Sequence, residues 1–327
     1  MPRGVTFASL QPLGLGVAAD TARSAQALGY SSFWTAEVNG PEAFSTLAFA
    51  HAAAPELDLG TGVIALQLRT PPLAAMAAAT LQAAAPDRTV YLGVGVSSPV
   101  VAGKWHGAGY GERPLAQTRE YLTLLRECLS GDRVDFAGDF YRVKGFRLGV
   151  RLEQRPKIVL GALGPKMLAL GGELADGVLL NYLPASHVRA SVERVRAGGN
   201  AEIFAYVHVG VCDTEGARDP ARKDLFSYAV VPSYADSFRA AGFGDEVDAI
   251  TAAHAAGDRS AALAAVSDRM CDAIDITGDA GRVAQALTEY EAAGVDHAIV
   301  MPLPWGDDRR AILAATLDAA APSGATA

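Results

Sequence analysis

The sequence predicts a (β/α)8 barrel, an α/β fold of the TIM-barrel type, from two features. First, one pattern recurs along the chain: a stretch with helical periodicity, then Gly or Asp-Gly, then a short apolar run. Examples are "ALGYSSFWTAE" (27–37), "LADGVLLNY" (174–182) and "AAGVDHAIVMP" (292–302). Glycine commonly ends a helix, and the apolar runs are too short to be helices. Second, eight such runs alternate with helical stretches in 327 residues, which favours parallel βαβ units. A doubly wound sheet is the alternative, because periodicity does not show whether a sheet closes.

The predicted elements follow one another along the whole chain. Besides the segments above, strands are expected within "GVTFAS" (4–9), "LDLGTGVIAL" (57–66), "TVYLGVGV" (89–96), "KIVLG" (157–161) and "EIFAYVHVGV" (202–211). The last helix is the best marked. Asp279 is a suitable N-cap, Val283 and Leu287 share one face with Tyr290, and Gly294 ends the helix.

Two segments interrupt the alternation of strands and helices. Residues 131–149 alternate apolar and polar side chains, which predicts a surface β-hairpin. Residues 214–277 are rich in Ala and Asp and predict a helical insertion before the last helix and strand. No linker divides the chain, so we expect one domain over residues 1–320. The tail at 321–327 is expected to be disordered.

Composition excludes several classes of protein. A net charge of −8 without a basic block argues against nucleic acid and against an anionic membrane surface. No apolar run approaches the ~20 residues that span a bilayer, and the N-terminus does not resemble a signal peptide. Three cysteines without C-x-x-C spacing exclude a disulfide framework and a zinc ribbon. These features favour a cytoplasmic protein that acts on a small molecule.

In a (β/α)8 barrel the active site lies at the carboxyl ends of the strands. Glu37 directly follows a strand, and an acid in an apolar pocket has an altered pKa and can move a proton. The alternative is a salt bridge between Glu37 and a neighbour such as Arg69. Residues 161–166, "GALGPK", are either a simple turn or an anion site at a helix N-terminus. His106 lies in a loop, and no metal-ligand cluster and no Ser-His-Asp order is evident.

Five blocks of the sequence carry a resemblance to a known family. They are "FWTAEVNGPEAFSTLAFAHA", "LDLGTGVIALQLRTPPLAAM", "VYLGVGVSSPVVAGKWHG", "GDRVDFAGDFYRVKG" and "VLGALGPKMLALGGELADGVLL". In this order they resemble the signature blocks of the bacterial luciferase-like superfamily, and within it they are most similar to the deazaflavin (coenzyme F420)-dependent oxidoreductases. The resemblance implies a barrel with a helical insertion before the last helix.

The resemblance also implies where the cofactor binds. Backbone amides of the turn after the fifth strand hold its phosphate, and a cis Gly62–Val63 bond in a bulge after the third strand supports its ring. Lys104, Lys166 and Arg69 are expected near the barrel mouth, where they could meet the cofactor's acidic tail. The residues assigned to the cofactor in this way are Gly62, Val63, Ser97, Ser98, Ala162, Leu163, Gly164 and Lys166.

The chain departs from the family's sugar-phosphate dehydrogenases. These carry Asp-His after the second strand and an acid after the fourth, where this chain has Ala36-Glu37 and Ser98. The resemblance therefore points to the reductases with Glu at the position of Glu37, and Glu37 becomes the candidate proton donor. The residues expected to shape the pocket beside it are Trp34, Trp105 and His106.

We therefore predict an F420-dependent oxidoreductase that transfers a hydride between the cofactor and a small organic substrate. The alternatives are an FMN-dependent monooxygenase of the same fold and a non-catalytic barrel that only binds a flavin-like ligand. The resemblance also implies a homodimer.

Overall fold

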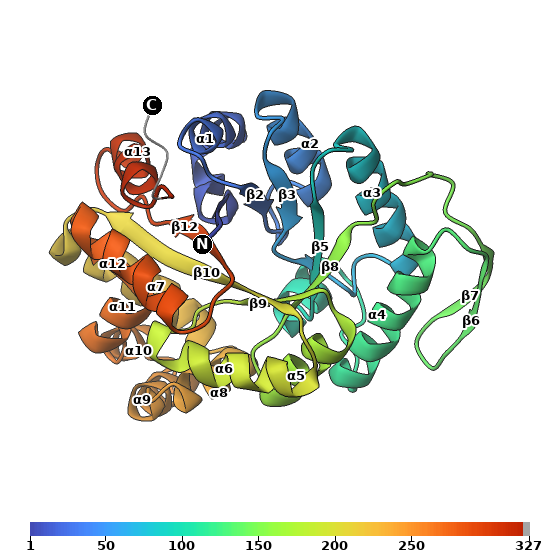
Figure 1. Ribbon diagram of the computed structural model, residues 1–327. Coiled ribbons are helices and arrows are strands. Elements are labelled where there is room, and N and C mark those ends of the chain that lie inside the picture. The colour runs from blue at the N-terminus through green and yellow to red at the C-terminus, as the bar shows by residue number, and fades with distance from the viewer. Residues whose placement is uncertain (323–327) are drawn as a thin grey trace.

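Eight parallel strands close into a barrel in the computed structural model, which describes residues 1–322 (Figure 1). The barrel strands are β1 (Arg3–Thr6), β2 (Ser32–Thr35), β3 (Asp58–Thr61), β5 (Val90–Gly95), β8 (Lys157–Gly161), β9 (Gly177–Leu180), β10 (Glu202–Val211) and β12 (His297–Pro302). Neighbouring strands pair in parallel, and β10 pairs with both β9 and β12, which closes the ring. The predicted barrel is confirmed, and the doubly wound alternative is excluded.

Helices surround the barrel. No helix among residues 1–322 is long and apolar enough to cross a membrane. The helices packed around the strands are α1 (Gly16–Ala27), α2 (Ala43–Ala53), α3 (Pro71–Ala84), α4 (Pro114–Leu129), α5 (Pro165–Leu174), α6 (Ala185–Gly198), α12 (Ala280–Ala292) and α13 (Arg309–Ala319). Asp279 caps α12 by accepting a hydrogen bond from the Arg282 N–H at 2.8 Å, as predicted.

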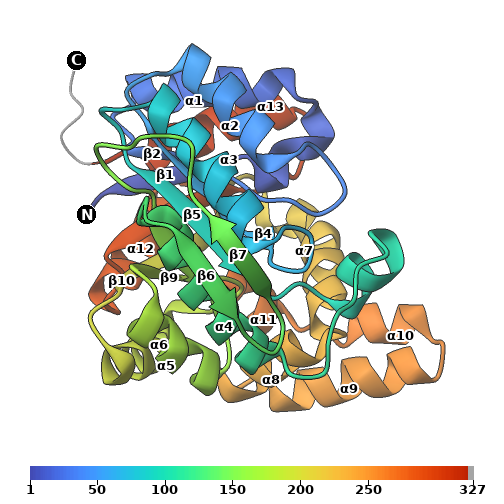
Figure 2. The same cartoon turned by 90° about the vertical axis from the view of Figure 1, so that its right-hand side faces the viewer.

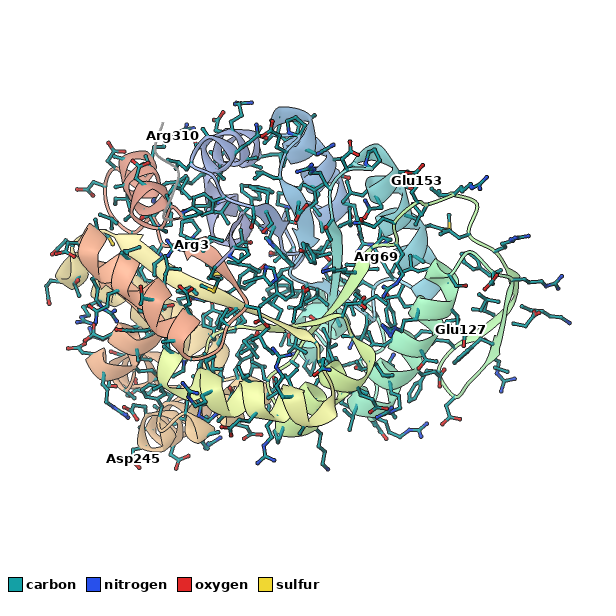
Figure 3. All side chains as sticks on the ribbon, in the orientation of Figure 1. Arg3, Arg69, Glu127, Glu153, Asp245 and Arg310 are labelled. Atoms are coloured by element: carbon teal, nitrogen blue, oxygen red, sulfur yellow. The ribbon has the colours of Figure 1, made fainter. Side chains whose placement is uncertain are left out.

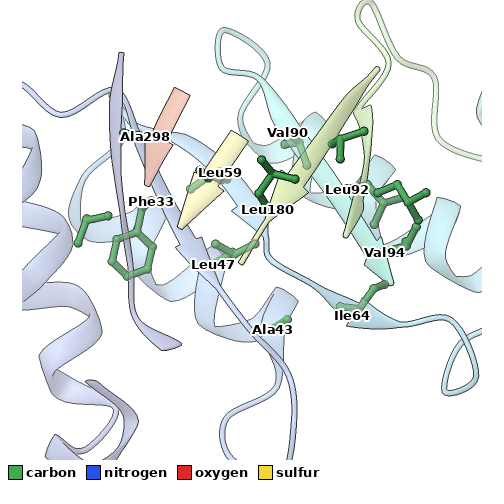
Figure 4. Close-up of a cluster of buried hydrophobic side chains, with 14 of the residues drawn as sticks. Phe33, Ala43, Leu47, Leu59, Ile64, Val90, Leu92, Val94, Leu180 and Ala298 are labelled. Atoms are coloured by element: carbon green, nitrogen blue, oxygen red, sulfur yellow. The ribbon is translucent and has the colours of Figure 1, made fainter. Parts of the chain in front are cut away.

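The barrel strands are apolar on both faces because helices cover the outside and side chains fill the inside. Phe33, Leu59 and Leu92 point outward and belong to the large apolar cluster beneath the helices, which also contains Leu47 of α2 (Figure 4). Every second residue points inward. The inner cluster contains Trp34, Tyr91, Val159, Leu179, Phe204, Tyr206, Ile299 and Met301.

The predicted helical insertion lies between β10 and α12, in the lower left part of Figure 1 and the lower right part of Figure 2. The helix α12, predicted as the last one, is followed by β12 and by α13, which was not predicted. It has its own apolar core, in which Leu225, Phe238 and Ile250 are fully buried. A short strand at its end, β11 (Asp275–Gly278), extends the sheet beside the second half of β10 and was not predicted. The helices are α7 (Thr214–Ala229), α8 (Pro232–Ala240), α9 (Gly244–Ala255), α10 (Arg259–Ala264) and α11 (Asp268–Ile274).

The remaining elements connect barrel units. The predicted hairpin is present as antiparallel strands β6 (Val134–Ala137) and β7 (Arg142–Phe146), which cross the front of Figure 2 near α4. Most of the tail expected to be disordered, residues 323–327, lies outside the described residues. The other short elements are η1 (Ala8–Leu13), β4 (Ile64–Ala65) and η2 (Pro99–Trp105).

Candidate functional site

A backbone bulge follows β3 at the carboxyl end of the barrel. The Gly62–Val63 peptide bond is cis, as expected. The Gly62 N–H donates to the Thr35 carbonyl at 2.6 Å, and the Tyr206 hydroxyl donates to the Gly62 carbonyl at 2.8 Å. The Glu37 N–H lies 3.4 Å from the Val63 carbonyl oxygen. The neighbouring strand β2, the residue Glu37 after it, and Tyr206 of β10 across the barrel therefore fix the polar groups of the bulge.

Glycine is required where this bulge meets its neighbours. A Cβ atom at Gly62 would lie 2.0 Å from the Tyr206 hydroxyl oxygen, and one at Gly93 would lie 1.8 Å from the Thr61 carbonyl oxygen. A Cβ at Gly95 would lie 2.8 Å from the Val63 side chain. Real Cβ atoms do not approach this closely. The glycines therefore let the bulge lie directly against β5, in the way that backbone approaches need glycine.

Glu37 forms the ion pair that the sequence left open as the alternative to a free acid. Both of its oxygens accept hydrogen bonds from Arg69, one at 2.9 Å, and the Ala43 N–H donates to it at 3.1 Å. Arg69, labelled near the middle of Figure 3, also binds Glu42 at 2.6 Å. The Glu37 side chain is only 11% exposed. Its carboxylate is therefore bound on both oxygens, to Arg69 and to the start of α2.

The aromatic residues predicted for the pocket lie in different places. Trp34 is completely buried inside the barrel, where its ring stacks on Tyr91 at 5.3 Å and its N–H donates to Ser32. It is a core residue, which corrects the expectation that it shapes the pocket. Trp105 is 56% exposed at the end of η2. The His106 Nε2–H donates to the Val38 carbonyl at 2.5 Å, so His106 fastens the segment after Glu37.

The predicted phosphate site lies at the start of α5. The Ala162 N–H donates to the Leu179 carbonyl at 3.2 Å and is therefore not available, which corrects part of the prediction. The N–H groups of Leu163, Gly164 and Lys166 have no acceptor among residues 1–322. Gly164 and Lys166 are exposed. Open amides at a helix N-terminus are suited to an anion.

The two serines after β5 are both half-buried. Ser98 caps η2, because its hydroxyl accepts from the Val101 N–H at 3.1 Å. Ser97 lies beside it at the end of β5. The predicted residues thus gather at the carboxyl ends of β2, β3, β5 and β8, with the exception of the Trp34 ring.

The residues predicted for the site do not include a polar cluster on the other side of the barrel mouth. His208 of β10 lies 3.0 Å from Asp275 of β11 through Nδ1 and 2.9 Å from Asn181 through Nε2. The Tyr182 hydroxyl donates to Asp224 of α7 at 2.8 Å, and the Tyr182 ring packs against His208 at 4.3 Å. One side-chain atom each of His208, Asp224 and Asp275 lies within 4.8 Å of the others. These residues are far apart in the sequence, so no short motif indicates that they form a cluster.

Burial shifts the pKa of each titratable group in this cluster toward the neutral form. It raises the pKa of Asp224 to about 7, and repulsion from Asp275 adds to the shift. Burial lowers the pKa of His208 to about 4 and raises that of Asp275 well above its ordinary value. Shifted acids in a barrel mouth are candidates for proton transfer.

A surface hollow of about 640 Å³ lies at the opposite end of the barrel. Leu129, Arg147 and Arg155 line it, between the end of α4 and the segment before β8. This position is the amino end of the strands, which in barrel enzymes contributes to stability rather than to catalysis. The hollow therefore contains none of the candidate residues.

Comparison with known proteins identifies the family. The sequence model of the luciferase-like monooxygenase family matches residues 6–297. A putative coenzyme F420-dependent oxidoreductase of Mycobacterium tuberculosis is 30% identical over 314 residues, which cover 86% of this chain and 89% of that protein. The coenzyme F420-dependent tetrahydromethanopterin reductase of Methanopyrus kandleri has a TM-score of 0.80 at 22% identity, over 97% of this chain and 96% of that one. The oxygenating constituent of 3,6-diketocamphane monooxygenase of Pseudomonas putida, solved with FMN, has a TM-score of 0.66 at 16% identity, over 98% and 97%. The chain belongs to the luciferase-like monooxygenase family.

Proposed function

We propose that this protein is an oxidoreductase that uses the deazaflavin coenzyme F420 and exchanges a hydride with a small organic substrate. The 30% identity to a relative named as a putative F420-dependent oxidoreductase supports the choice of cofactor. The structural observation that carries the proposal is the glycine-lined bulge at Gly62–Val63, with open amides at the start of α5. Both features lie at the carboxyl ends of barrel strands, where such folds bind ligands.

The residues present fit a flat ring with a phosphate-bearing side chain. The bulge at Gly62–Val63 would support the ring, and the amides of Leu163, Gly164 and Lys166 would bind the phosphate. When bound, the coenzyme supplies the two-electron hydride chemistry. The chain orients the ring, binds the anion and excludes water from the barrel interior.

The basic residues expected to meet the cofactor's acidic tail are not equivalent. Arg69 is occupied by Glu37 and Glu42 and is only 14% exposed. Lys104 and Lys166 are exposed and remain available. Exposed ion pairs contribute only about 0–1 kcal/mol each, so the tail should add little affinity in salt.

We propose that Glu37 positions the segment beside the bulge.

An FMN-dependent monooxygenase is the alternative, because the FMN-bound monooxygenase noted above shares the fold. FMN and the deazaflavin share a tricyclic ring, a ribityl chain and a phosphate, so the phosphate site alone does not separate them. A barrel that binds a flavin-like ligand without turnover is a third possibility. The homodimer and the cytoplasmic location stay predictions.

Parallel titrations of cofactor-free protein test the proposal. The ligands are F420, FMN and the deazaflavin that lacks the phosphate and tail, followed by fluorescence. We expect F420 to bind more tightly than either of the others. Tighter binding of FMN, or yellow protein purified with bound FMN, would favour the monooxygenase. Equal binding of F420 and the phosphate-free deazaflavin would show that the start of α5 does not bind the phosphate.

Gly164→Asp with Gly164→Asn as its control isolates the phosphate contact. A Cβ at Gly164 meets no atom within 4 Å, and both Asp and Asn are good N-caps for α5. The two variants therefore differ mainly in charge. We expect Gly164→Asp to weaken F420 binding by about tenfold or more relative to Gly164→Asn, because a carboxylate repels the phosphate. Equal affinities would show that the phosphate binds elsewhere.

A further inference from the structure

We propose that the carboxyl group of Asp224 exchanges a proton with the substrate, and that the substrate presents a neutral carbonyl, hydroxyl or C=N group to Asp224 and Tyr182. This inference deepens the proposed function and rests on it. It assigns proton transfer to the insertion side of the barrel mouth, opposite the ion-paired Glu37.

The placement of Asp224 supports this role. His208 and Asp275 are fully buried, but Asp224 is only half-buried, so it is the member of the cluster that approaches solvent. Tyr206 and His208 occupy inward positions two residues apart on β10, about 7 Å along the strand. The Tyr206 hydroxyl contacts the Gly62 carbonyl, so β10 connects the bulge with the cluster, whose His208 lies two residues further toward the carboxyl end of the strand.

Tyr182 holds the Asp224 carboxyl in place. Its hydroxyl donates to Asp224 Oδ2 at 2.8 Å, and its backbone has a φ of 49°. Bulky residues rarely adopt this left-handed conformation, and those that do concentrate at functional sites. The Tyr182 ring also packs against Tyr228 at 3.8 Å and Tyr234 at 5.7 Å, which fixes its direction.

The hydrogen bonds beneath Asp224 determine where the protons reside. Asn181 Oδ1 accepts from the Tyr182 N–H at 3.0 Å, so it can only be an acceptor for His208 Nε2. Neutral His208 therefore carries its proton on Nε2 and presents a bare Nδ1 to Asp275. That 3.0 Å contact needs a proton from the Asp275 carboxyl. Asp275 Oδ2 is buried without a partner among residues 1–322.

Among the described residues, the two acids lack a fixed cation as a partner. Within residues 1–322, no salt bridge joins Asp224 or Asp275 to a lysine or arginine. An anionic group on the substrate would therefore be unpaired beside them, whereas a neutral oxygen or nitrogen can share the proton. Burial raises the pKa of Asp224 to about 7, so both of its protonation states are populated near neutrality. The titratable groups that face it are Tyr182, His208, Tyr228, Tyr234 and Asp275.

The proton transfer balances in either direction. In reduction, the substrate carbon of a C=O or C=N group accepts a hydride, with its two electrons, from the reduced cofactor. The Asp224 O–H bond breaks, and a new O–H or N–H bond forms on the substrate. Asp224 is left as a carboxylate, which water at the mouth reprotonates. In oxidation, the substrate carbon would give its hydride, with two electrons, to the oxidised cofactor, and the Asp224 carboxylate takes the proton from the hydroxyl or amine.

Infrared titration of the full chain tests the acid without any substrate. We expect a protonated carboxyl signal that disappears as the pH rises through about 7, with and without F420. The signal should be absent from Asp224→Asn and unchanged in Asp87→Asn, an exposed control. A wild-type protein in which no Asp224 signal titrates above about pH 5 would overturn the proposal.

Turnover tests the substrate class and the role together. Reduced F420 is mixed with matched pairs of neutral carbonyl compounds and carboxylates, and its oxidation is followed by absorbance. We expect neutral compounds to react, and Asp224→Asn to lower their turnover about 100-fold or more with F420 affinity changed less than twofold. Asp224→Glu should recover part of the loss. If Asp224→Asn does not fold, Tyr182→Phe should shift the infrared titration, and an unchanged titration would overturn the proposal.

The two proposals fail in different ways. If F420 does not bind, the proposed function fails, while the infrared titration still reports on Asp224. If F420 binds and turns over normally in Asp224→Asn, only the inference about Asp224 fails. Preferential reaction of carboxylates would overturn the neutral substrate class.

Discussion

The two ends of the barrel differ in whether their side chains and backbone groups are packed against protein or left open to a ligand. At the amino end, aromatic rings close the interior: Trp34 stacks on Tyr91 at 5.3 Å, and Phe204 stacks on His297 at 4.4 Å. At the carboxyl end, amides at α5 lack protein acceptors among residues 1–322, and Asp275 keeps an unpartnered oxygen. The packed rings of the amino end stabilise the fold. The other end leaves groups free for a ligand.

Two aspartates show the same difference in their pKa values. Burial opposes ionisation of Asp176, at the amino end of β9, but Arg155, the Ile158 N–H and Arg126 outweigh it and lower its pKa to about 2. Burial raises the pKa of Asp224 to about 7, because no such partners are supplied. The residue type is the same, so the partners that each end provides decide the protonation state.

The largest effect is expected from Gly62→Ala at the carboxyl end. The added Cβ would lie 2.0 Å from the Tyr206 hydroxyl oxygen, which is itself fixed by the Gly62 carbonyl. We expect a loss of about 3 kcal/mol in the free energy of unfolding, the upper range for overpacking, and loss of F420 binding. Urea denaturation and cofactor titration measure both effects.

Gly16→Ala is the matched control, because a Cβ at Gly16 meets no atom within 4 Å. It should leave F420 binding unchanged and should not lower stability, because alanine is favoured over glycine within the helix α1. Adding Tyr206→Phe to Gly62→Ala removes the clashing oxygen, so the double variant should lose less stability than the sum of the single variants. Strict additivity would show that the bulge does not depend on this contact.

A medium effect is expected from Asp176→Asn at the amino end. The depressed pKa means that the carboxylate stabilises the folded protein above its ordinary pKa of 3.8, and that this stability is lost as the pH falls toward about 2. We expect a loss of about 2 kcal/mol at neutral pH that vanishes in acid. Asp87→Asn is an exposed control. A loss that does not depend on pH would show that shape, not charge, matters at this position.

Much of the fold could be predicted because it rests on local patterns. All eight barrel strands, the hairpin and the capped helix α12 coincide with periodicity, glycines and N-caps in the sequence. Strand β11 was not predicted because the segment "DITG" is short and largely polar. Only its pairing with β10 makes it a strand. The sequence thus predicts the units and their order.

The site could be predicted only where it follows the strands directly. The resemblance located the bulge and the start of α5, but it did not reveal that the Ala162 amide bonds Leu179. The pocket position predicted for Trp34 was wrong, because the alternation along a strand gives the direction in which a side chain points but not its height along the barrel axis. The polar cluster around His208 and Asp224 depends on packing of an insertion against the mouth, which no local pattern encodes.

The smallest effect is expected from Glu37→Gln, at the carboxyl end of the barrel. Glutamine can still accept one of the bonds from Arg69 or Ala43, and Glu42 still pairs with Arg69 at 2.6 Å. We expect a loss of about 1 kcal/mol in the free energy of unfolding, measured by urea denaturation. F420 affinity and turnover should fall together, by less than about tenfold, because the segment beside the bulge loosens.

This pattern is the reverse of that expected for Asp224→Asn, where turnover falls and affinity holds. Measuring both variants on the same neutral substrate therefore separates positioning from proton transfer. A fall of about 100-fold in turnover with unchanged affinity in Glu37→Gln would mean that its carboxylate moves the proton despite the ion pair with Arg69. The acid would then lie on the bulge side of the mouth, and Asp224 would serve the fold of the insertion.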